Sequence, residues 1–82
     1  MNKNYTIYCS PSHAWLLVPK KDIQELQISQ QISKCSFKTH QNFFLEEDLD
    51  MPLFLASAKA KNWNVKIINE KEIESPLILR EK

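Results

Sequence analysis

Residues 42–56 constrain the fold of this 82-residue chain more than any other stretch. A short aromatic run, Asn42 to Leu45, is followed by four acidic residues within five positions and then by an apolar segment. The first turn of a helix has unpaired N–H groups and the positive end of the helix dipole, so acidic residues are favoured there. The stretch therefore predicts a strand, a helix start with Asp48 or Asp50 as N-cap, and a helix.

The helix after these acids has a predicted inward stripe and a predicted end. Apolar side chains recur at helical spacing, at Met51, Phe54, Leu55 and Ala58. Asn62 is a plausible C-cap. Because the chain contains no glycine, left-handed backbone positions should fall on asparagines, and Asn42, Asn62 and Asn69 are the candidates.

The remaining segments predict a small α+β domain. Apolar and polar residues alternate as in strands over 5–9 and 63–67, and further strands are predicted over the apolar run 14–18, which should be buried on both faces, and over 32–38 and 43–46. The short link between 5–9 and 14–18 predicts an antiparallel hairpin. Residues 20–27 have the pattern of a short amphipathic helix. We expect Ile23 and Leu26 of that helix, and Cys35 and Phe37 of the third strand, to face inward. The order ββα–ββα–β favours an antiparallel or mixed sheet with two helices on one face. One domain, 1–82, should contain a polar linker and an apolar tail at 77–79 within residues 69–82.

Composition and charge narrow the class of function. Hydrophobic residues make up 43% and charged residues 26% of the chain, which is typical of a globular domain. A net charge of +1 gives neither the basic excess of a DNA-binding protein nor the acidic excess of a DNA mimic, so direct nucleic-acid binding is not expected. Residues 1–45 are mildly basic and residues 46–82 mildly acidic, which leaves association into a homodimer open.

Hydropathy and cysteine usage predict a cytoplasmic protein. The chain has no stretch of the roughly 18 apolar residues needed for a membrane span, and no apolar run follows its first lysine as in a signal peptide. We therefore expect Cys9 and Cys35 to be reduced thiols.

The acidic run is the main candidate site. Four carboxylates, Glu46, Glu47, Asp48 and Asp50, are explained by helix capping and solvation, but they could also form a partner-binding surface or hold a divalent cation. The run lacks the calcium-loop pattern, so we expect no metal there. Tyr8 and Phe44 have polar or mixed neighbours on their strand faces, and exposure of their rings would mark an interface.

Cysteine and histidine form two pairs that suggest an alternative. Cys9 precedes His13 by four positions and Cys35 precedes His40 by five, and convergence of the pairs would make a zinc site or a Cys–His catalytic site. The spacing differs from that of a zinc-finger knuckle, and no helix start follows either cysteine to lower its pKa. We therefore expect no cofactor, no metal and no catalysis. A second alternative is weak binding of single-stranded nucleic acid by aromatic side chains on the sheet.

Three motifs resemble a group of small proteins from bacterial phages, plasmids and related mobile elements. They are His13-Ala14-Trp15-Leu16-Leu17-Val18-Pro19, then Ser36-Phe37, then Phe44-Leu45-Glu46-Glu47-Asp48-Leu49-Asp50. The usual form of the group is His-Gly-Trp-Leu-x-Val-Pro, Ser-Tyr and Tyr-Leu-Glu-Glu-Asp-x-Asp. This chain departs from that form at three positions, with Ala14 in place of glycine and Phe37 and Phe44 in place of tyrosine. The likeness covers roughly residues 5–68.

The resemblance implies an accessory protein that binds host machinery. Inhibitors of bacterial defence, of the anti-CRISPR or anti-restriction type, are one such class. The leading hypothesis is therefore a non-catalytic protein that binds a host protein or ribonucleoprotein complex. Its acidic run would meet arginines and lysines that normally hold nucleic acid.

Overall fold

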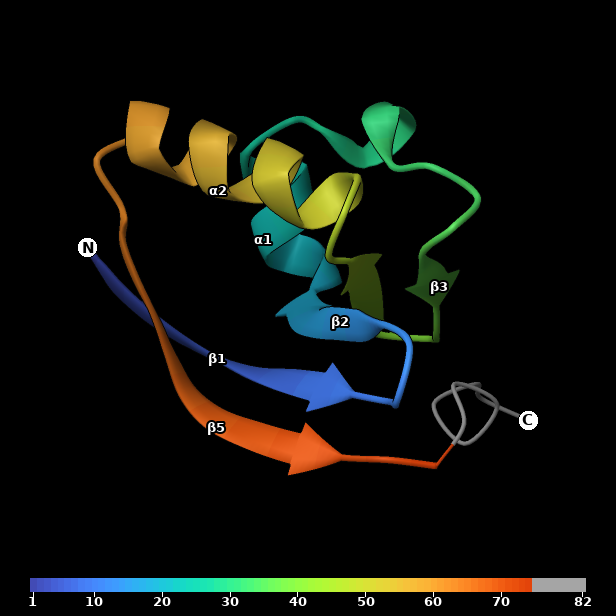
Figure 1. Ribbon diagram of the computed structural model, residues 1–82. Helices are drawn as coiled ribbons and strands as arrows, with labels where there is room; N and C mark the ends of the chain where they lie inside the picture. Colours follow the sequence, from blue (N-terminus) through green and yellow to red (C-terminus); the bar gives the residue numbers. More distant parts are fainter. Residues whose placement is uncertain (75–82) are drawn as a thin grey trace.

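The computed structural model describes residues 1–74, and within them Figure 1 shows a five-stranded sheet with two helices on one side. The strands are β1 (Asn2–Cys9), β2 (Ala14–Pro19), β3 (Phe37–Lys38), β4 (Asn42–Glu46) and β5 (Asn64–Glu72). The helices are α1 (Lys20–Glu25) and α2 (Asp50–Ala60), and a 3-10 turn spans Ser29–Gln31. This order confirms the predicted α+β class. The predicted tail at 77–79 lies outside the described residues.

The sheet is mixed and has the strand order β3-β4-β2-β1-β5. Antiparallel pairing joins β1 to β2, β2 to β4 and β3 to β4, whereas β5 runs parallel to β1. The parallel register extends from Asn2 opposite Asn64 to Cys9 opposite Glu72, with a bulge between Tyr5 and Thr6. The prediction of a polar linker from residue 69 is therefore wrong for 69–72, because pairing with β1 holds these polar residues in the sheet.

The main core lies between the sheet and the helices. The largest fully buried side chains come from β2, β4 and both helices, namely Leu16, Val18, Ile23, Leu45 and Phe54. Buried Ile23 and Leu26 confirm the inward face predicted for the first helix, and Phe54 and Ala58 confirm part of the stripe on α2. Leu55 is 37% exposed, so its predicted place in that stripe is wrong. It lies one residue beyond Phe54, about 100° further round the helix, on a side that the sheet does not cover.

Two non-glycine residues adopt left-handed backbone conformations within residues 1–74, Gln27 with φ 60° and Asn62 with φ 63°. Asn62 has the predicted left-handed conformation, but its predicted C-cap role is wrong by one position, because Lys61 is the C-cap residue of α2. Asn42 and Asn69 lie in β4 and β5 instead, so the prediction of left-handed conformations there is wrong. Gln27 takes the corresponding position after α1, where its N–H donates to the Gln24 carbonyl at 3.0 Å.

The third strand is much shorter than the predicted 32–38. Only Phe37 and Lys38 pair with β4, and residues 32–36 form an irregular loop. Cys35 is exposed and Phe37 is half-buried, so the expectation that both face the core is wrong for Cys35. The cause is not local, because Ser33 and Ser36 of this loop bind a carboxylate on α2.

The face of the sheet away from the helices carries a second, smaller cluster. Trp15 and Phe44 are its buried members. Four partly buried side chains pack against them, Tyr8, Leu17, Phe37 and Ile73. The sheet thus has apolar side chains on both faces, although the helices within residues 1–74 cover only one of them (Figure 1).

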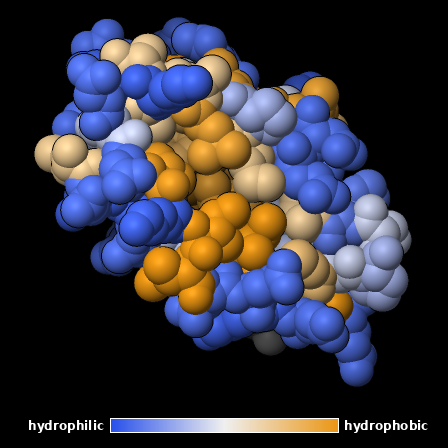
Figure 2. Space-filling view, turned by 60° about the vertical axis from the view of Figure 1, so that its left-hand side comes forward, coloured by the Kyte–Doolittle hydropathy of each residue, from blue (hydrophilic) through white to orange (hydrophobic). Residues whose placement is uncertain are grey.

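Apolar side chains also reach the surface on one side of the molecule. Figure 2 shows them as a band with a hollow, bordered by hydrophilic side chains. Large apolar residues that are exposed on α2 and β5 include Leu55, Ile67 and Ile68, the last at 58%. Within the described part of the chain, neither helix has the length and apolar character required to cross a bilayer.

Candidate docking site

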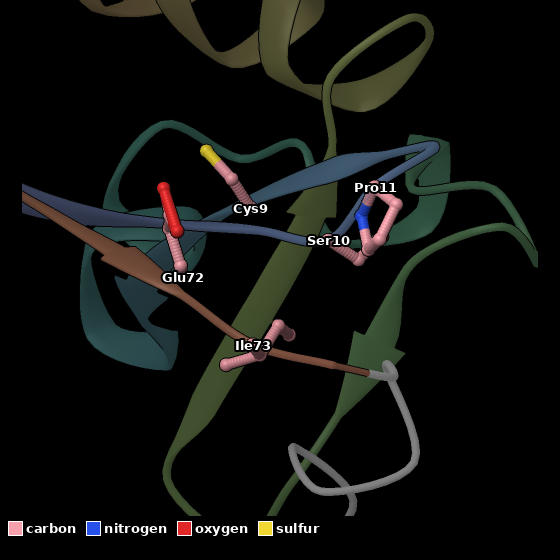
Figure 3. A pocket seen from close by; sticks show the side chains of 5 residues that line it. All are labelled: Cys9, Ser10, Pro11, Glu72 and Ile73. Carbon is pink, nitrogen blue, oxygen red and sulfur yellow. The ribbon is translucent and has the colours of Figure 1, made fainter.

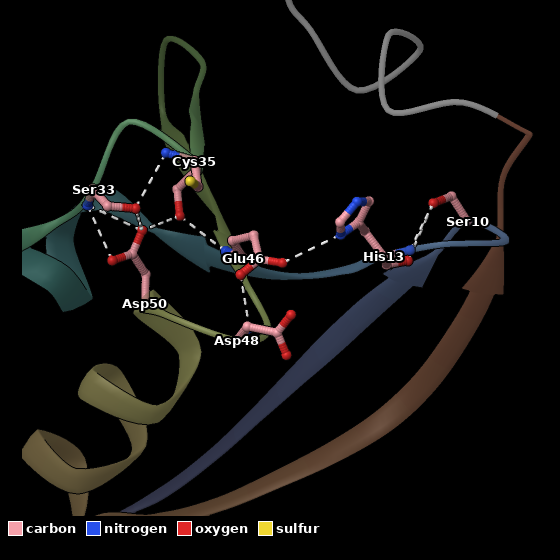
Figure 4. Close-up of polar contacts among 8 residues, drawn as sticks. Ser10, His13, Ser33, Cys35, Glu46, Asp48 and Asp50 are labelled. Carbon is pink, nitrogen blue, oxygen red and sulfur yellow. Dashed lines mark hydrogen bonds and ion pairs between the residues drawn. The ribbon is translucent and has the colours of Figure 1, made fainter.

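An open pocket of about 610 Å³ lies where β2 and β4 meet the loop before β3. Its walls come from the β1–β2 turn, three strands, the 33–36 loop and the turn before α2: His13, Trp15, Lys34, Cys35, Phe37, Glu46, Asp48 and Leu49. The fold therefore gathers four residues that the sequence singled out, His13, Cys35, Glu46 and Asp48. Figure 4 shows the polar contacts in this region.

Asp50 is the first residue of α2, yet its side chain turns away from solvent and is 3% exposed. Its two oxygens each accept the Ser33 N–H at 3.0 Å, and Oδ2 also accepts the Ser33 hydroxyl at 2.7 Å. The Ser36 hydroxyl donates to the same Oδ2. The predicted N-cap role of Asp48 or Asp50 is wrong, because Leu49 is the N-cap residue and no side chain caps this helix start.

Glu46, the last residue of β4, is also internal, at 7% exposed. Its Oε1 accepts the Asp48 N–H at 2.7 Å, and its Oε2 lies 3.5 Å from Nδ1 of His13 (Figure 4). The Glu46 N–H donates to the Ser36 hydroxyl oxygen at 2.9 Å, so Ser36 connects β4 to the Asp50 carboxylate. The expectation of one solvated acidic face is therefore wrong for Glu46 and Asp50. Asp48 is exposed, and Glu47 is half-buried.

A different group of carboxylates gathers at the end of β1. Glu47 from the turn and Glu70 and Glu72 from β5 all act on the Cys9 thiol, whose pKa is raised by burial and then by the negative charges of Glu70, Glu47 and Glu72. We call these three carboxylates the acidic cluster. Figure 3 shows the Cys9 thiol and the Glu72 carboxylate extending to the same side of the sheet, beside a small pocket of about 220 Å³.

The two cysteine–histidine pairs do not form a metal site in the part of the chain that the structure describes. Within residues 1–74, no three histidine, cysteine or acidic side chains are placed to share a metal ion. Cys9 ends β1, Cys35 and His13 line the larger pocket, and His40 is exposed in the turn before β4. Both cysteines are unpaired.

Tyr8 and Phe44 pack against each other instead of extending into solvent as a pair. Their ring centroids are 5.7 Å apart at 67°, an edge-to-face contact. Phe44 is only 8% exposed, so it does not meet the condition of exposure under which its ring would mark an interface, while Tyr8 is half-buried with Lys71 Nζ 5.9 Å from its ring centroid. The same burial of Phe44 and Trp15 leaves little ring surface for stacking nucleobases.

The sequence did not predict the contacts that position the loop and the aromatic wall of the larger pocket. Ser33 and Ser36 hold the loop, and Trp15 stacks on Phe37 with centroids 5.5 Å apart at 22°. Serine at both ends of a four-residue segment is a turn signal, which could have argued against a strand there. The contact between Trp15 and Phe37 depends on pairing through β4, for which neither segment alone carries a signal.

Taken together, the fold and this region define a small α+β domain with an open pocket and a neighbouring acidic cluster. Comparison with protein-family models, with curated proteins and with solved structures gave no significant match. The function therefore has to be argued from the pocket and the carboxylates themselves.

Proposed function

We propose that this protein is a non-catalytic binding protein that docks on a basic surface of a host macromolecular complex. The observation that carries the proposal is the acidic cluster of Glu47, Glu70 and Glu72. These residues come from two separate segments, and among residues 1–74 the ion pairs involve other side chains. Three carboxylates that form no ion pair within residues 1–74 present a negative surface that attracts lysines and arginines of a partner.

The turn before α2 contributes to both the acidic cluster and the larger pocket, which lie toward different faces of the sheet, since Cys9 packs with the main core and Trp15 and Phe37 with the second cluster. Glu47 belongs to the cluster, and the next residue, Asp48, is exposed and lines the pocket. A partner that extends around this turn could contact charge at the cluster and apolar surface in the pocket. Protein interfaces combine these two features, with charge at the rim and aromatic or aliphatic anchors at the centre.

The chemistry of the region supports binding better than catalysis. Burial and three nearby carboxylates raise the pKa of Cys9, which lowers its thiolate fraction and hence its nucleophilicity. Glu46 and Asp50 are each engaged by backbone or hydroxyl donors that hold the loop and the helix start. Carboxylates committed in this way stabilise the fold.

The class of partner comes from the resemblance to accessory proteins of mobile elements. Host defence complexes of the CRISPR–Cas and restriction types hold nucleic acid with arginines and lysines, and an acidic surface can occupy such residues. We therefore propose an inhibitor of this kind, acting in the cytoplasm of a bacterial host.

A binding assay with purified CRISPR–Cas effector and restriction complexes tests the proposal. The test variant is Glu47→Gln/Glu70→Gln/Glu72→Gln, and the control is Glu25→Gln, which removes an exposed carboxylate on α1. The triple variant should bind at least tenfold more weakly and the control should bind normally, with wild-type binding falling as salt rises. Unchanged binding by a folded triple variant would contradict the proposal, as would the absence of binding to every complex of both types.

A further inference from the structure

The outer edge of β5 has no neighbouring strand within residues 1–74. β5 ends the strand order of the sheet, and Figure 1 shows it outside β1. The N–H groups of Asn64 and Ile73 donate to the carbonyls of residues 1 and 9, at 2.7 and 2.8 Å. Backbone groups of successive residues in a strand point to opposite sides, so the N–H groups of Val65 and Glu72 point away from β1. The same alternation, on each side of the bulge, gives four residues with outward N–H and C=O groups: Val65, Ile67, Glu70 and Glu72.

The side chains of these four residues share the face of β5 that points toward the helices. In the parallel register Ile67 lies opposite Tyr5 and Glu72 lies opposite Cys9, and both partners in β1 pack with the main core. Val65 is partly buried against the same core, whereas Ile67 is 46% exposed and both glutamates are exposed. This face is therefore apolar over the first half of β5, and over the second half it carries two members of the acidic cluster.

The other face of β5 is basic. Lys66 lies opposite Asn4, and Lys71 lies opposite Tyr8, with its Nζ 5.9 Å from the centroid of the tyrosine ring. Tyr8 packs with the second cluster, on the side of the sheet away from the helices. The two faces of this edge therefore favour different neighbours. Cationic and apolar side chains suit the helix-facing side, and neutral or acidic side chains suit the other.

We infer that an extended segment of the partner adds as a further strand to the outer edge of β5. Lysine or arginine side chains at two alternate positions lie opposite Glu70 and Glu72, and apolar side chains lie opposite Val65 and Ile67. The inference rests on the proposed function, which supplies a basic partner. In strand addition, main-chain hydrogen bonds give affinity and alternate side chains give specificity. Opposite charges directly across a strand pair stabilise it.

A partner strand with regular alternation matches both halves of β5. Ile68 is the extra residue at the bulge, because Ile67 and Asn69 lie opposite consecutive residues of β1. In a bulge, two residues of one strand oppose a single residue of the other. A regular strand therefore keeps its cations opposite the two glutamates while its apolar side chains stay on the same face, opposite Val65 and Ile67.

A second copy of this chain fits the edge less well than a basic partner. In an antiparallel pair of β5 strands with their outward backbone groups matched, Lys66 lies opposite Lys71 on one face and Ile67 lies opposite Glu70 on the other. Like charges directly opposite each other are destabilising, and the glutamate gains no cationic neighbour. The charges on β5 thus favour a strand of different sequence.

Titration of the ¹⁵N-labelled protein with synthetic peptides tests the inference by NMR. The N-acetylated peptide amide Lys-Thr-Lys-Thr-Val-Thr-Val fits the antiparallel direction, and the reversed sequence fits the parallel direction. One of these lysine peptides should shift the amide signals of Glu70 and Glu72, with saturation in the millimolar range. It should also slow the hydrogen exchange of these two amides and leave that of the inward Lys71 amide unchanged. Control peptides with glutamate in place of both lysines should bind at least tenfold more weakly.

A matched pair of variants separates the backbone contribution from the charge. Glu72→Gln removes the charge and keeps the outward N–H, whereas Glu72→Pro removes both. Proline is tolerated on an edge strand where the N–H that it lacks would face solvent. Glu72→Pro should bind the lysine peptide at least about threefold more weakly than Glu72→Gln. If Glu72→Pro does not fold, a lysine peptide with N-methylated backbone amides, which keeps its charges, should show the same loss with the wild-type protein.

Equal binding of the lysine and glutamate peptides would overturn the inference, because it would show that charge does not select the strand. The absence of any shift at Glu70 and Glu72, or equal binding by folded Glu72→Gln and Glu72→Pro, would also overturn it. The result is separable from the proposed function. Loss of partner binding in the acidic-cluster variant, with no response to either lysine peptide, would leave the docking proposal standing and remove strand addition alone.

Discussion

Replacement of Asp50 by alanine should destabilise the fold far more than replacement of Asp48, although the two acids are two positions apart. Asp50→Ala removes the acceptor of the Ser33 N–H, the Ser33 hydroxyl and the Ser36 hydroxyl. A hydrogen bond to a charged group contributes about 1.5–3 kcal/mol. Both serines are half-buried, so water can replace part of each contact. We therefore expect a total loss of about 3 kcal/mol in the free energy of unfolding.

The comparison with Asp48 makes the prediction specific. Asp48 is exposed, and only its backbone N–H forms one of the hydrogen bonds in this region, which alanine retains. Asp48→Ala should therefore change stability by less than about 0.5 kcal/mol. The free energy of unfolding of an 82-residue domain is about 4–12 kcal/mol, so the Asp50 effect is a large fraction of it.

Urea unfolding followed by tryptophan fluorescence and by circular dichroism measures both variants, with the two probes checking two-state behaviour. Amide hydrogen exchange at Ser33 gives a local readout, which should accelerate in Asp50→Ala and stay unchanged in Asp48→Ala. Equal stabilities for the two variants would refute the reasoning, because they would mean that Asp50 is as solvated as Asp48.

Three further predictions follow from other parts of the fold. Gln27→Gly should raise the free energy of unfolding by about 0.5–1 kcal/mol, because glycine relieves the left-handed backbone at φ 60°, and a lower urea midpoint would contradict this. Tyr5→Phe should cost about 1–3 kcal/mol, since the Tyr5 hydroxyl donates to buried Asp22 Oδ2 at 2.8 Å. Burial and this hydrogen bond raise the pKa of Tyr5, so its contribution is complete below the ordinary tyrosine pKa of about 10 and should be lost as pH rises further. Spectrophotometric titration of phenolate in wild type and in Tyr5→Phe measures the pKa of Tyr5, and an ordinary tyrosine pKa at this position would refute the prediction. Iodoacetamide at pH 8 should alkylate exposed Cys35 before Cys9, because burial and nearby acids raise the pKa of Cys9. Mass spectrometry of the Cys9→Ser and Cys35→Ser variants measures the two rates, and faster modification of Cys9 would contradict the prediction.

Local patterns in the sequence predict much of this fold. The first hairpin, the inward residues Ile23 and Phe54, and the left-handed conformation of Asn62 after α2 all follow from alternation, helical spacing and the absence of glycine. These features depend on neighbours within a few positions, which is the range over which such patterns carry information.

The candidate site was harder to predict because its contacts are not local. Asp50 turns inward because Ser33, seventeen positions earlier, offers three donors with Ser36, and nothing in the acidic run indicates this. Glu47 joins Glu70 and Glu72 only because β5 returns beside β1. The four acids therefore look alike in the sequence and have three different environments in the structure.

The parallel pairing of β5 with β1 also determines when the protein can finish folding during synthesis. Residues 64–72 leave the ribosome well after β1 and β2, and until they do so β1 has one bare edge beside its hairpin with β2. A nascent chain shorter than this exposes backbone N–H and C=O groups that can pair with other chains. The sheet thus cannot be completed before residues 64–72 have been synthesised, and truncated products ending before residue 64 are the species expected to aggregate.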